Sequence, residues 1–151
     1  NTTLPIIAAG GIASGESMAA VMCLGAEGVQ VGSKFAATIE SSAHEEFKKA
    51  IVQAKDGDTE LTLKELTPVR LLKNEFYNQV QTAYDNNSTK EDLEKLLGRG
   101  RAKKGMFEGN LVEGELEIGQ VSAQIDSIVS AKDVVNEIMT GYQKTLQKLQ
   151  L

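Results

Sequence analysis

The sequence predicts an α/β fold that contains two parallel strands of a larger sheet, followed by a mostly helical segment. Two short apolar runs, over residues 4–9 and 28–31, are each followed by glycine. Apolar runs of this length are typical of strands that are buried on both faces of a parallel sheet. A helical pattern separates the two runs, and helical patterns dominate the chain after them. This order is that of a β-α-β unit with a helical extension.

The β-α-β unit is predicted from local signals. The first strand is expected over residues 5–9, where two β-branched isoleucines favour extended backbone. A helix is predicted over Gly15–Leu24, with Ser14 as its N-cap. Gly25 is expected to end this helix in the left-handed conformation. The second strand is predicted over residues 28–31.

The glycines after the two strands mark a candidate anion site. Gly10 and Gly11 follow the first strand, and Gly32 follows the second. Glycine has no Cβ atom, so backbone N–H groups can approach an anion closely. A helix joins the two strands, so the two glycine loops are expected to lie side by side, an arrangement that suits a phosphate group. In (β/α)8 barrels a phosphate site commonly forms from the loops after strands seven and eight.

The predicted fold class is therefore the C-terminal portion of a (β/α)8 TIM barrel, with its last two strands and a mostly helical C-terminal extension. A complete barrel needs about 250 residues, whereas this chain has 151 and begins with Asn1 rather than methionine. We expect the C-terminal part of a larger protein, and the alternative is a complete small α/β domain. Residues 1–55 are assigned to the last βα units and residues 56–151 to a helical extension that packs on the barrel.

Further elements are predicted directly after the second strand. Residues 33–40 are expected to form a loop or a short helical turn. Ser42 and Glu45 have the spacing of a capping box, which predicts the start of the next helix. Residues 59–66 alternate weakly and are expected to be extended.

Two more helices are predicted in the middle of the chain. Thr67-Pro68 has the pattern of an N-cap followed by proline at the first helical position, and an apolar face then continues to Tyr84. Ser88 and Glu91 form a second capping-box pattern, and Gly98 is expected to end the helix that it opens.

The last third of the chain is predicted to be loop-rich and then helical. Six glycines fall within residues 98–119, which indicates loops. A helix is expected over residues 120–129, and Ser130 with Asp133 predicts the start of the final helix.

The composition excludes several classes of protein. The net charge of −5 argues against general nucleic-acid binding. The single cysteine, Cys23, excludes an internal disulfide framework and a cysteine-based zinc site, and its apolar neighbours predict a buried thiol. No apolar run approaches the length of about 18 residues that a membrane-spanning helix needs. The absence of disulfides and of a targeting segment fits a cytoplasmic protein.

Three groups of ionisable residues are expected to be structural. His44, the only histidine, lies in the first turn of a predicted helix. The four basic residues within positions 99–104 are expected to form a solvated face, with an anion or RNA contact as the alternative. Glu113, Glu115 and Glu117 alternate in a glycine-rich segment, which favours an exposed edge over acid–base chemistry or metal binding.

The two glycine loops resemble those of the nitronate monooxygenase family, formerly called 2-nitropropane dioxygenases. The resemblance is carried by residues 8–12 (AAGGI) and 24–35 (LGAEGVQVGSKF). It continues through residues 40–44 and resumes at residues 114–120. The FMN-dependent enoyl-acyl-carrier-protein reductases (reductase II) of the same superfamily are equally similar over these residues.

This resemblance implies an FMN-binding barrel. By position, the backbone amides of Gly10, Gly11, Gly32 and Ser33 would bind the FMN phosphate, the Ser33 hydroxyl would be an extra donor, and Gln120 would lie near the cofactor. No metal site is implied. The catalytic histidine of the family lies upstream of the glycine pair, so no catalytic residue is expected in this chain, and the chain alone is expected to be inactive.

The activity that the resemblance implies is the oxidation of alkyl nitronates with O2. The alternatives are an enoyl-acyl-carrier-protein reductase that uses NAD(P)H and, from another class, a non-catalytic binding or assembly module. The expected partners are a small-molecule substrate and, through an exposed barrel edge, another copy of the chain in a homo-oligomer. Neither a nucleic acid nor a membrane is expected as a partner.

Two positions depart from the patterns of related barrels. Inosine-monophosphate dehydrogenases and α-hydroxy-acid oxidases often have aspartate before the glycine pair, and Ala9 at this position favours nitronate monooxygenases. Most relatives carry serine or threonine followed by arginine after the second strand. This chain has Ser33-Lys34 instead, which keeps the positive charge but not the planar guanidinium.

Overall fold

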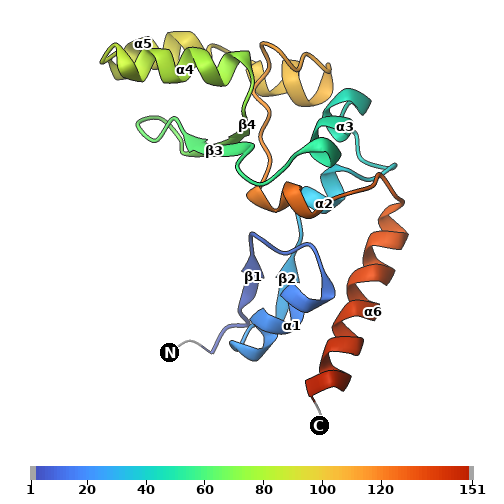
Figure 1. Ribbon diagram of the computed structural model, residues 1–151. Coiled ribbons are helices and arrows are strands. Elements are labelled where there is room, and N and C mark those ends of the chain that lie inside the picture. Colours follow the sequence, from blue (N-terminus) through green and yellow to red (C-terminus); the bar gives the residue numbers. More distant parts are fainter. Residues whose placement is uncertain (1–2, 150–151) are drawn as a thin grey trace.

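The computed structural model describes residues 3–149 and shows an α/β chain with two small sheets (Figure 1). The elements are, in order, β1 (Ile7–Ala9), α1 (Gly15–Cys23), β2 (Gly28–Gln30), α2 (Ser33–Ala36), α3 (Glu45–Gln53), β3 (Thr59–Thr62), β4 (Val69–Leu72), α4 (Glu75–Asp85), α5 (Lys90–Leu97), the π-helix η1 (Lys103–Phe107), the 3-10 helix η2 (Gln120–Gln124) and α6 (Ala131–Leu149). Figure 1 shows β1, β2 and α1 at one end of the molecule, α4 and α5 at the other, and α6 alongside α1. No helix within the described range is both long and apolar enough to cross a bilayer.

The β-α-β unit forms as predicted. β1 and β2 pair in parallel, with Ala9 opposite Gln30, and α1 is the crossover. The Ser14 Oγ accepts a hydrogen bond from the Ser17 N–H (3.2 Å), which satisfies one of the free donors at the start of α1. Gly25 follows the end of α1 with φ +99°, so the predicted left-handed glycine is confirmed.

The two strands are more exposed than the sequence predicts. Ile6 and Ile7 keep 51% and 54% of their surfaces exposed. Neither β1 nor β2 contains a buried residue, so the prediction of burial on both faces is wrong for the described chain. Cys23 is also exposed at the end of α1, beside the exposed Leu24, so the prediction of a buried thiol is wrong as well. Apolar neighbours in sequence do not bury a side chain when no other element covers that side of the helix.

A β-hairpin replaces the first part of the predicted helix after Thr67-Pro68. β3 and β4 pair antiparallel. The segment around Glu117 extends this sheet, since Glu117 bridges to Leu71 and the Leu72 N–H donates to the Leu116 carbonyl oxygen (3.0 Å). Threonine followed by proline is compatible with a helix start and with extended backbone, and pairing with distant residues decides between them. The C-terminal extension therefore contains one short β-hairpin among its helices.

The starts of α3 and α4 differ from the predicted ones. The side chain of Asn74 is the N-cap of α4, so this helix begins well after the hairpin. His44 is the N-cap of α3, because its Nδ1 accepts a hydrogen bond from the Glu46 N–H (3.2 Å). The predicted capping box of Ser42 and Glu45 is wrong for this reason.

The start of α5 lies one residue after the predicted one. Thr89 and Asp92 form its capping box rather than Ser88 and Glu91. The sequence holds two overlapping capping-box patterns, and the structure uses the second. Gly98 ends α5 with φ +63°, and the predicted end is confirmed.

The helix predicted over residues 120–129 is only the short η2, Gln120–Gln124. The start of the final helix is confirmed, since the Ser130 Oγ accepts a hydrogen bond from the Asp133 N–H (3.1 Å) at the beginning of α6.

Two apolar clusters form the core, and neither contains a residue of β1 or β2. The first joins α3 to β4 and η2, and its buried members are Ala37, Phe47, Ile51, Leu72, Leu116, Ile118 and Ile125. The second joins the hairpin to α4 and α5, and its buried members are Leu63, Leu71, Phe76, Val80 and Leu93. The β-α-β unit is therefore attached to the rest of the chain mainly by contacts outside these two clusters, above all those between α1 and α6.

Glycine allows α1 and α6 to cross in backbone contact. A Cβ atom on Gly15 would overlap the backbone of Gly141 and Tyr142. Protein interiors leave no room to absorb such an overlap without moving a helix. The close crossing is what places α6 along the β-α-β unit.

We expect Gly15→Ala to lower the free energy of unfolding by about 2–3 kcal/mol, because the added methyl group must push α6 away from α1. Ala20→Gly is the control, since this exposed position on the same helix should lose only about 1 kcal/mol through backbone entropy. Urea unfolding followed by circular dichroism measures both variants. A Gly15→Ala protein as stable as the wild type would contradict the close crossing.

Candidate functional site

A small pocket lies at the carboxyl ends of β1 and β2. Its volume is about 180 Å³, and its lining residues are Ala9, Gly10, Gly11, Ile12, Gln30, Gly32, Ser33, Gly119 and Val121. They come from the last residues of β1 and β2, the loops that follow these strands and the start of η2. The structure thus brings together four of the five residues predicted to bind a cofactor, which are Gly10, Gly11, Gly32 and Ser33.

The loop after β1 requires glycine at both positions. Gly10 has φ +90° and Gly11 has φ +71°, conformations that residues with a side chain rarely adopt. No atom beyond the chain neighbours lies within 4 Å of a Cβ placed on either glycine, so both backbones border open space. Outside the helices and strands of residues 3–149, no backbone hydrogen bond uses the N–H of Gly10 or Gly11.

The loop after β2 adds further donors. Ser33 is the first residue of α2, so its N–H has no acceptor inside that helix. The Ser33 Oγ accepts a hydrogen bond from the Gly119 N–H (3.1 Å). A hydroxyl group that accepts a hydrogen bond still has its own proton to donate. Ser33 can therefore hold the start of η2 against the pocket and donate to a ligand at the same time.

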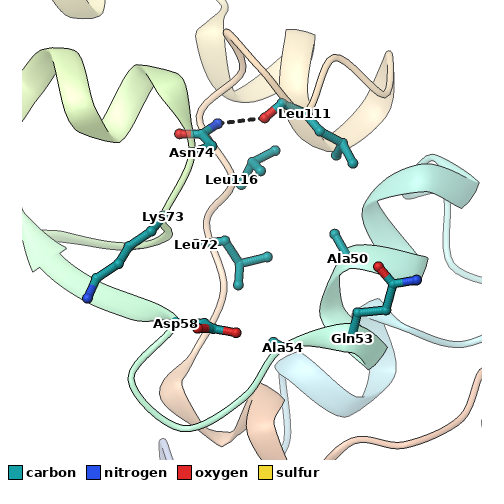
Figure 2. Close-up of a pocket in the computed structure, with 9 residues that line it drawn as sticks. All are labelled: Ala50, Gln53, Ala54, Asp58, Leu72, Lys73, Asn74, Leu111 and Leu116. Atoms are coloured by element: carbon teal, nitrogen blue, oxygen red, sulfur yellow. Dashed lines mark hydrogen bonds between the residues drawn. The ribbon is translucent and has the colours of Figure 1, made fainter.

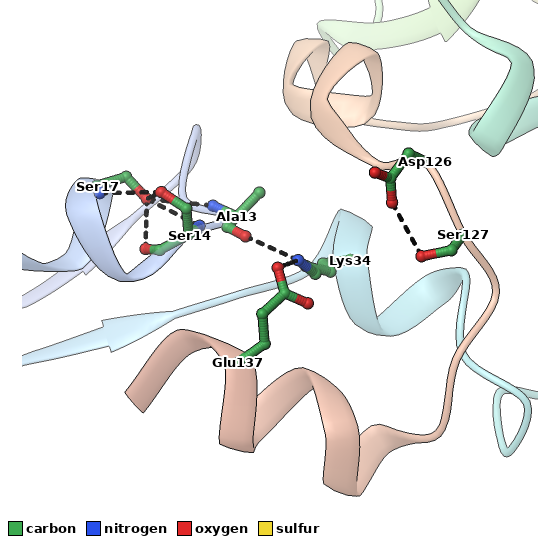
Figure 3. Close-up of polar contacts among 7 residues, drawn as sticks. All are labelled: Ala13, Ser14, Ser17, Lys34, Asp126, Ser127 and Glu137. Carbon is green, nitrogen blue, oxygen red and sulfur yellow. Dashed lines mark hydrogen bonds and ion pairs between the residues drawn. The ribbon is translucent and has the colours of Figure 1, made fainter. Parts of the chain in front are cut away.

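Lys34 neutralises Glu137 rather than lining the pocket. Its Nζ donates to the Ala13 carbonyl oxygen (3.2 Å) and forms an ion pair with Glu137 Oε1 (2.5 Å), as Figure 3 shows. These contacts join the loop after β1, α2 and α6. The positive charge that follows Ser33 in the sequence thus has a structural partner.

Two glutamines lie in or next to the pocket. Gln120 is exposed and does not line the pocket, although its neighbours Gly119 and Val121 do. Gln30 lines the pocket from the end of β2, and the sequence analysis missed it as a site residue. Its position as the last polar side chain before the glycine of the second loop was the signal that could have identified it.

The lining of the pocket supports binding but not acid–base catalysis. None of its lining residues carries a carboxylate, imidazole, thiol, amine or guanidinium group. The donors are backbone N–H groups, one serine hydroxyl and one glutamine amide. Such groups complement the oxygens of an anion and cannot exchange protons near neutral pH.

A second groove, of about 350 Å³, lies between α3 and the end of β4 (Figure 2). Asn74 lines it, and its Nδ2 donates to the carbonyl oxygens of Leu111 and Gly114 (both 2.8 Å). The Asp58 carboxylate accepts a hydrogen bond from the Lys55 N–H (2.7 Å). These polar groups hold loops in place, so we assign this groove a structural role.

Arg101 is a structural residue rather than part of a solvated basic face. Its Nε, Nη1 and Nη2 donate to the carbonyl oxygens of Leu97, Glu113 and Leu96, each at 2.8 Å. Its guanidinium carbon lies 4.5 Å from the centre of the Phe76 ring. The prediction of a solvated face is therefore wrong for this arginine, whose donors cap the carbonyl groups at the end of α5.

One of the three alternating glutamates is buried, contrary to the predicted exposed edge. Glu115 keeps only 7% of its surface exposed. Burial and, secondarily, the nearby charge of Glu117 raise the pKa of Glu115 to about 7, while Arg101 acts in the opposite direction. Glu113 instead accepts a hydrogen bond from Lys104, which lowers the pKa of Glu113. Glu115 does not line the pocket at the strand ends, so we assign it no part in that site.

The raised pKa of Glu115 makes stability depend on pH. The unfolded chain releases this proton near pH 4.3, as glutamate usually does, but the folded chain releases it only near 7. The folded state therefore loses stability as the pH rises between these values. We expect Glu115→Gln to be more stable than the wild type by about 1–2 kcal/mol at pH 8 and equally stable at pH 4.

Urea unfolding at the two pH values measures this effect. Glu113→Gln is the control, because the pKa of Glu113 is lowered and its replacement should bring no gain at pH 8. A Glu115→Gln effect of equal size at pH 4 and pH 8 would refute the link to proton binding.

Comparison with known proteins identifies relatives of the chain. A family model described as nitronate monooxygenase matches residues 1–141. A "Probable nitronate monooxygenase" of Staphylococcus saprophyticus is 37% identical over 119 residues, which cover 78% of this chain and 33% of that protein. A protein of the same name from Bacillus subtilis is 28% identical over 137 residues, which cover 90% of this chain and 39% of the relative.

Solved structures show the same α/β arrangement. FabK from Thermotoga maritima matches with a TM-score of 0.87 and 35% identity, over 99% of this chain and 47% of that one. A nitroalkane oxidase from Streptomyces ansochromogenes matches with a TM-score of 0.74 and 28% identity, over 98% of this chain and 42% of that one. The chain thus spans between a third and a half of the length of these proteins. Since the family model matches residues 1–141 of 151, the chain belongs to the nitronate monooxygenase family.

Proposed function

We propose that the chain is the C-terminal part of an FMN-dependent oxidoreductase and forms the site for the cofactor phosphate. The reaction we assign to the whole protein is the oxidation of alkyl nitronates with O2. One observation carries the proposal. Two glycine loops that lie 21 residues apart in the sequence, at Gly11 and Gly32, line one pocket with backbone donors that bear no side chain.

The residues present fit a phosphate group. The N–H groups of Gly10 and Gly11 border open space and, within residues 3–149, are not used in backbone hydrogen bonds outside regular elements. Gly32 also has open space at its Cβ position, and Ser33 provides an N–H and a hydroxyl. Backbone amides at the end of parallel strands form charge-assisted hydrogen bonds with phosphate oxygens. We place Gln120 at the rim of this site, next to Gly119, rather than on the phosphate.

The contribution of this chain is to bind and orient the cofactor. Bound FMN would supply the electron transfer between the nitronate and dioxygen. The pocket has no ionisable side chain, so the residues described here would hold the phosphate and move no proton. We therefore assign proton transfer to a part of the protein outside this pocket, and we expect no turnover from the chain alone.

An enoyl-acyl-carrier-protein reductase is the alternative. Two FabK structures from Thermotoga maritima match 99% of this chain, with TM-scores of 0.83 and 0.87. In that reaction, reducing equivalents would pass from NAD(P)H to an enoyl thioester. Both activities use the same phosphate site, so the pocket alone does not distinguish them.

The exposed strands fit a larger barrel. Ile7, the first residue of β1, and Ile6 before it keep about half of their surfaces exposed. Exposed apolar strands pair readily with further strands. We propose that the remaining strands of a (β/α)8 barrel, or a second copy of the chain, cover this edge.

We expect Gly32→Ala to weaken FMN binding about 10-fold or more, because its methyl group would stand in the open space beside the pocket. The φ of −101° at Gly32 is accessible to alanine, so the fold should be unaffected. Ala20→Ser, on the exposed side of α1, is the control. FMN fluorescence titration of the full-length protein measures the dissociation constant. An unchanged affinity for FMN in Gly32→Ala would argue against a phosphate at this position.

The two activities are separated by assays on the full-length, FMN-loaded protein. We expect oxygen uptake that requires propionate-3-nitronate, and little oxidation of NADH by an enoyl thioester. NADH oxidation that depends on the thioester would establish the reductase instead. A colourless protein that binds no FMN would count against both enzymes and in favour of a non-catalytic module.

A further inference from the structure

Lys34 lies between the two glycine loops and α6. It directly follows Ser33, which lines the phosphate pocket, but Lys34 itself does not line that pocket and its side chain is only 11% exposed. Its Nζ donates to the Ala13 carbonyl oxygen (3.2 Å) and pairs with Glu137 Oε1 (2.5 Å), as Figure 3 shows. One side chain thus joins the loop after β1, the start of α2 and the middle of α6.

The loop after β1 depends on such a contact because it is built from glycine. The pairing of β1 with β2 ends before this loop, and Gly10 and Gly11 have no side chain that could pack. Outside the helices and strands of residues 3–149, no backbone hydrogen bond uses the N–H group of either glycine. The next hydrogen bonds are at Ala13, whose N–H donates to the Ser17 Oγ (3.3 Å) and whose carbonyl oxygen accepts from Lys34. Since Ser17 belongs to the helix that follows directly, the contact with Lys34 is the one that ties this loop to α2 and so to the other glycine loop.

Glu137 keeps Lys34 in this position. An ammonium group that is almost buried needs an anionic partner, and a carbonyl oxygen alone compensates its charge only in part. Without the carboxylate, Lys34 would be drawn toward water or toward an anion in the adjacent pocket, and it would release Ala13. The Glu137 side chain is 59% exposed, so water can solvate its carboxylate when Lys34 is absent. The dependence is therefore one-sided, because the lysine needs the glutamate more than the glutamate needs the lysine.

The helix that carries Glu137 is fixed on both sides of this residue. At the start of α6, the Ala131 N–H donates to Glu40 Oε2 (2.8 Å) in the segment after α2. One turn after Glu137, Gly141 lies in backbone contact with Gly15 of α1. The carboxylate is therefore held at a defined place relative to α1 and α2.

We propose that Glu137 is a positioning residue for the cofactor phosphate. It holds Lys34, and Lys34 holds the loop of Gly10 and Gly11 at the distance from α2 that the phosphate requires. The inference rests on the proposed function, since it concerns how that phosphate site keeps its shape. Neither Lys34 nor Glu137 lines the pocket, so both act on the phosphate only through the loop.

Dissociation constants of FMN and of riboflavin, which lacks the phosphate, test the proposal. Flavin fluorescence titration of the full-length protein, stripped of flavin, measures both constants. We expect the wild type to bind FMN more tightly than riboflavin. Glu137→Ala should weaken FMN about 5- to 10-fold and riboflavin by less than about twofold, because only the phosphate contacts depend on the position of the loop.

Glu46→Ala is the matched control. Glu46 forms an exposed ion pair with Lys49 (2.8 Å) within α3, and neither residue lines the pocket. The control removes the same carboxylate and the same kind of contact, but it joins no distant segments. We expect it to leave the affinities for both flavins unchanged.

A double-mutant cycle tests whether Glu137 acts through Lys34. Lys34→Met removes both contacts and should weaken FMN at least as much as Glu137→Ala does. In the Lys34→Met background, Glu137→Ala should have no further effect on FMN, because the carboxylate is then solvated and holds nothing. Glu137→Gln keeps the shape and an acceptor but not the charge. It should give a smaller loss with the same dependence on Lys34, which protects the test if Glu137→Ala folds poorly.

The possible outcomes separate this proposal from the proposed function. Additive effects of the two substitutions, or equal losses of FMN and riboflavin, would indicate a general effect on folding and overturn the proposal. Tighter binding of FMN by Glu137→Ala would also overturn it, because Lys34 would then be a phosphate ligand that Glu137 withholds. An unchanged FMN affinity in Glu137→Ala, with a wild type that still prefers FMN to riboflavin, would refute the role of Glu137 alone. A wild type that binds both flavins equally would refute the phosphate site itself.

Discussion

The arrangement of the site depends on polar contacts made by the first two residues of α2. Ser33 accepts the N–H of Gly119, 86 residues away, and Lys34 binds Glu137, 103 residues away. The same lysine also donates to the Ala13 carbonyl oxygen in the loop after β1. Since β1 and β2 contribute nothing to either apolar cluster, these contacts and the crossing of α1 with α6 position the two glycine loops.

The pairing of Lys34 with Glu137 also sets the electrostatics of the pocket. The lysine side chain is only 11% exposed, so it needs a partner, and the carboxylate provides one. As a result the pocket has no ionised side chain in its lining, and an anion there would meet only oriented dipoles. Dipoles fixed by backbone geometry select the shape of a ligand more than its total charge.

Features fixed by a few neighbouring residues could be predicted from the sequence. The crossover helix, its Ser14 cap and the glycines after both strands depend on local chemistry, and the structure has them all. Features that depend on distant partners could not be predicted. The residues after Thr67-Pro68 form the strand β4 because β3 and the segment around Glu117 pair with them. Glu115 is buried by packing that its alternating pattern does not reveal, and Gln120 was placed by resemblance alone.

The partners of three cationic side chains show what each charge stabilises in the fold. Arg101 uses every nitrogen on carbonyl oxygens and packs on Phe76, so its charge stabilises the end of α5. The charge of Lys34 is likewise paired, with the carboxylate of Glu137. Arg70 donates through Nη1 alone, to the carbonyl oxygen and the Oγ1 of Thr59, and it lines a groove that shares Gly32, Ser33 and Gly119 with the phosphate pocket. Because neither of its other two nitrogens is buried, water can satisfy the donors that Thr59 does not, and this guanidinium joins β4 to β3 at little cost in solvation.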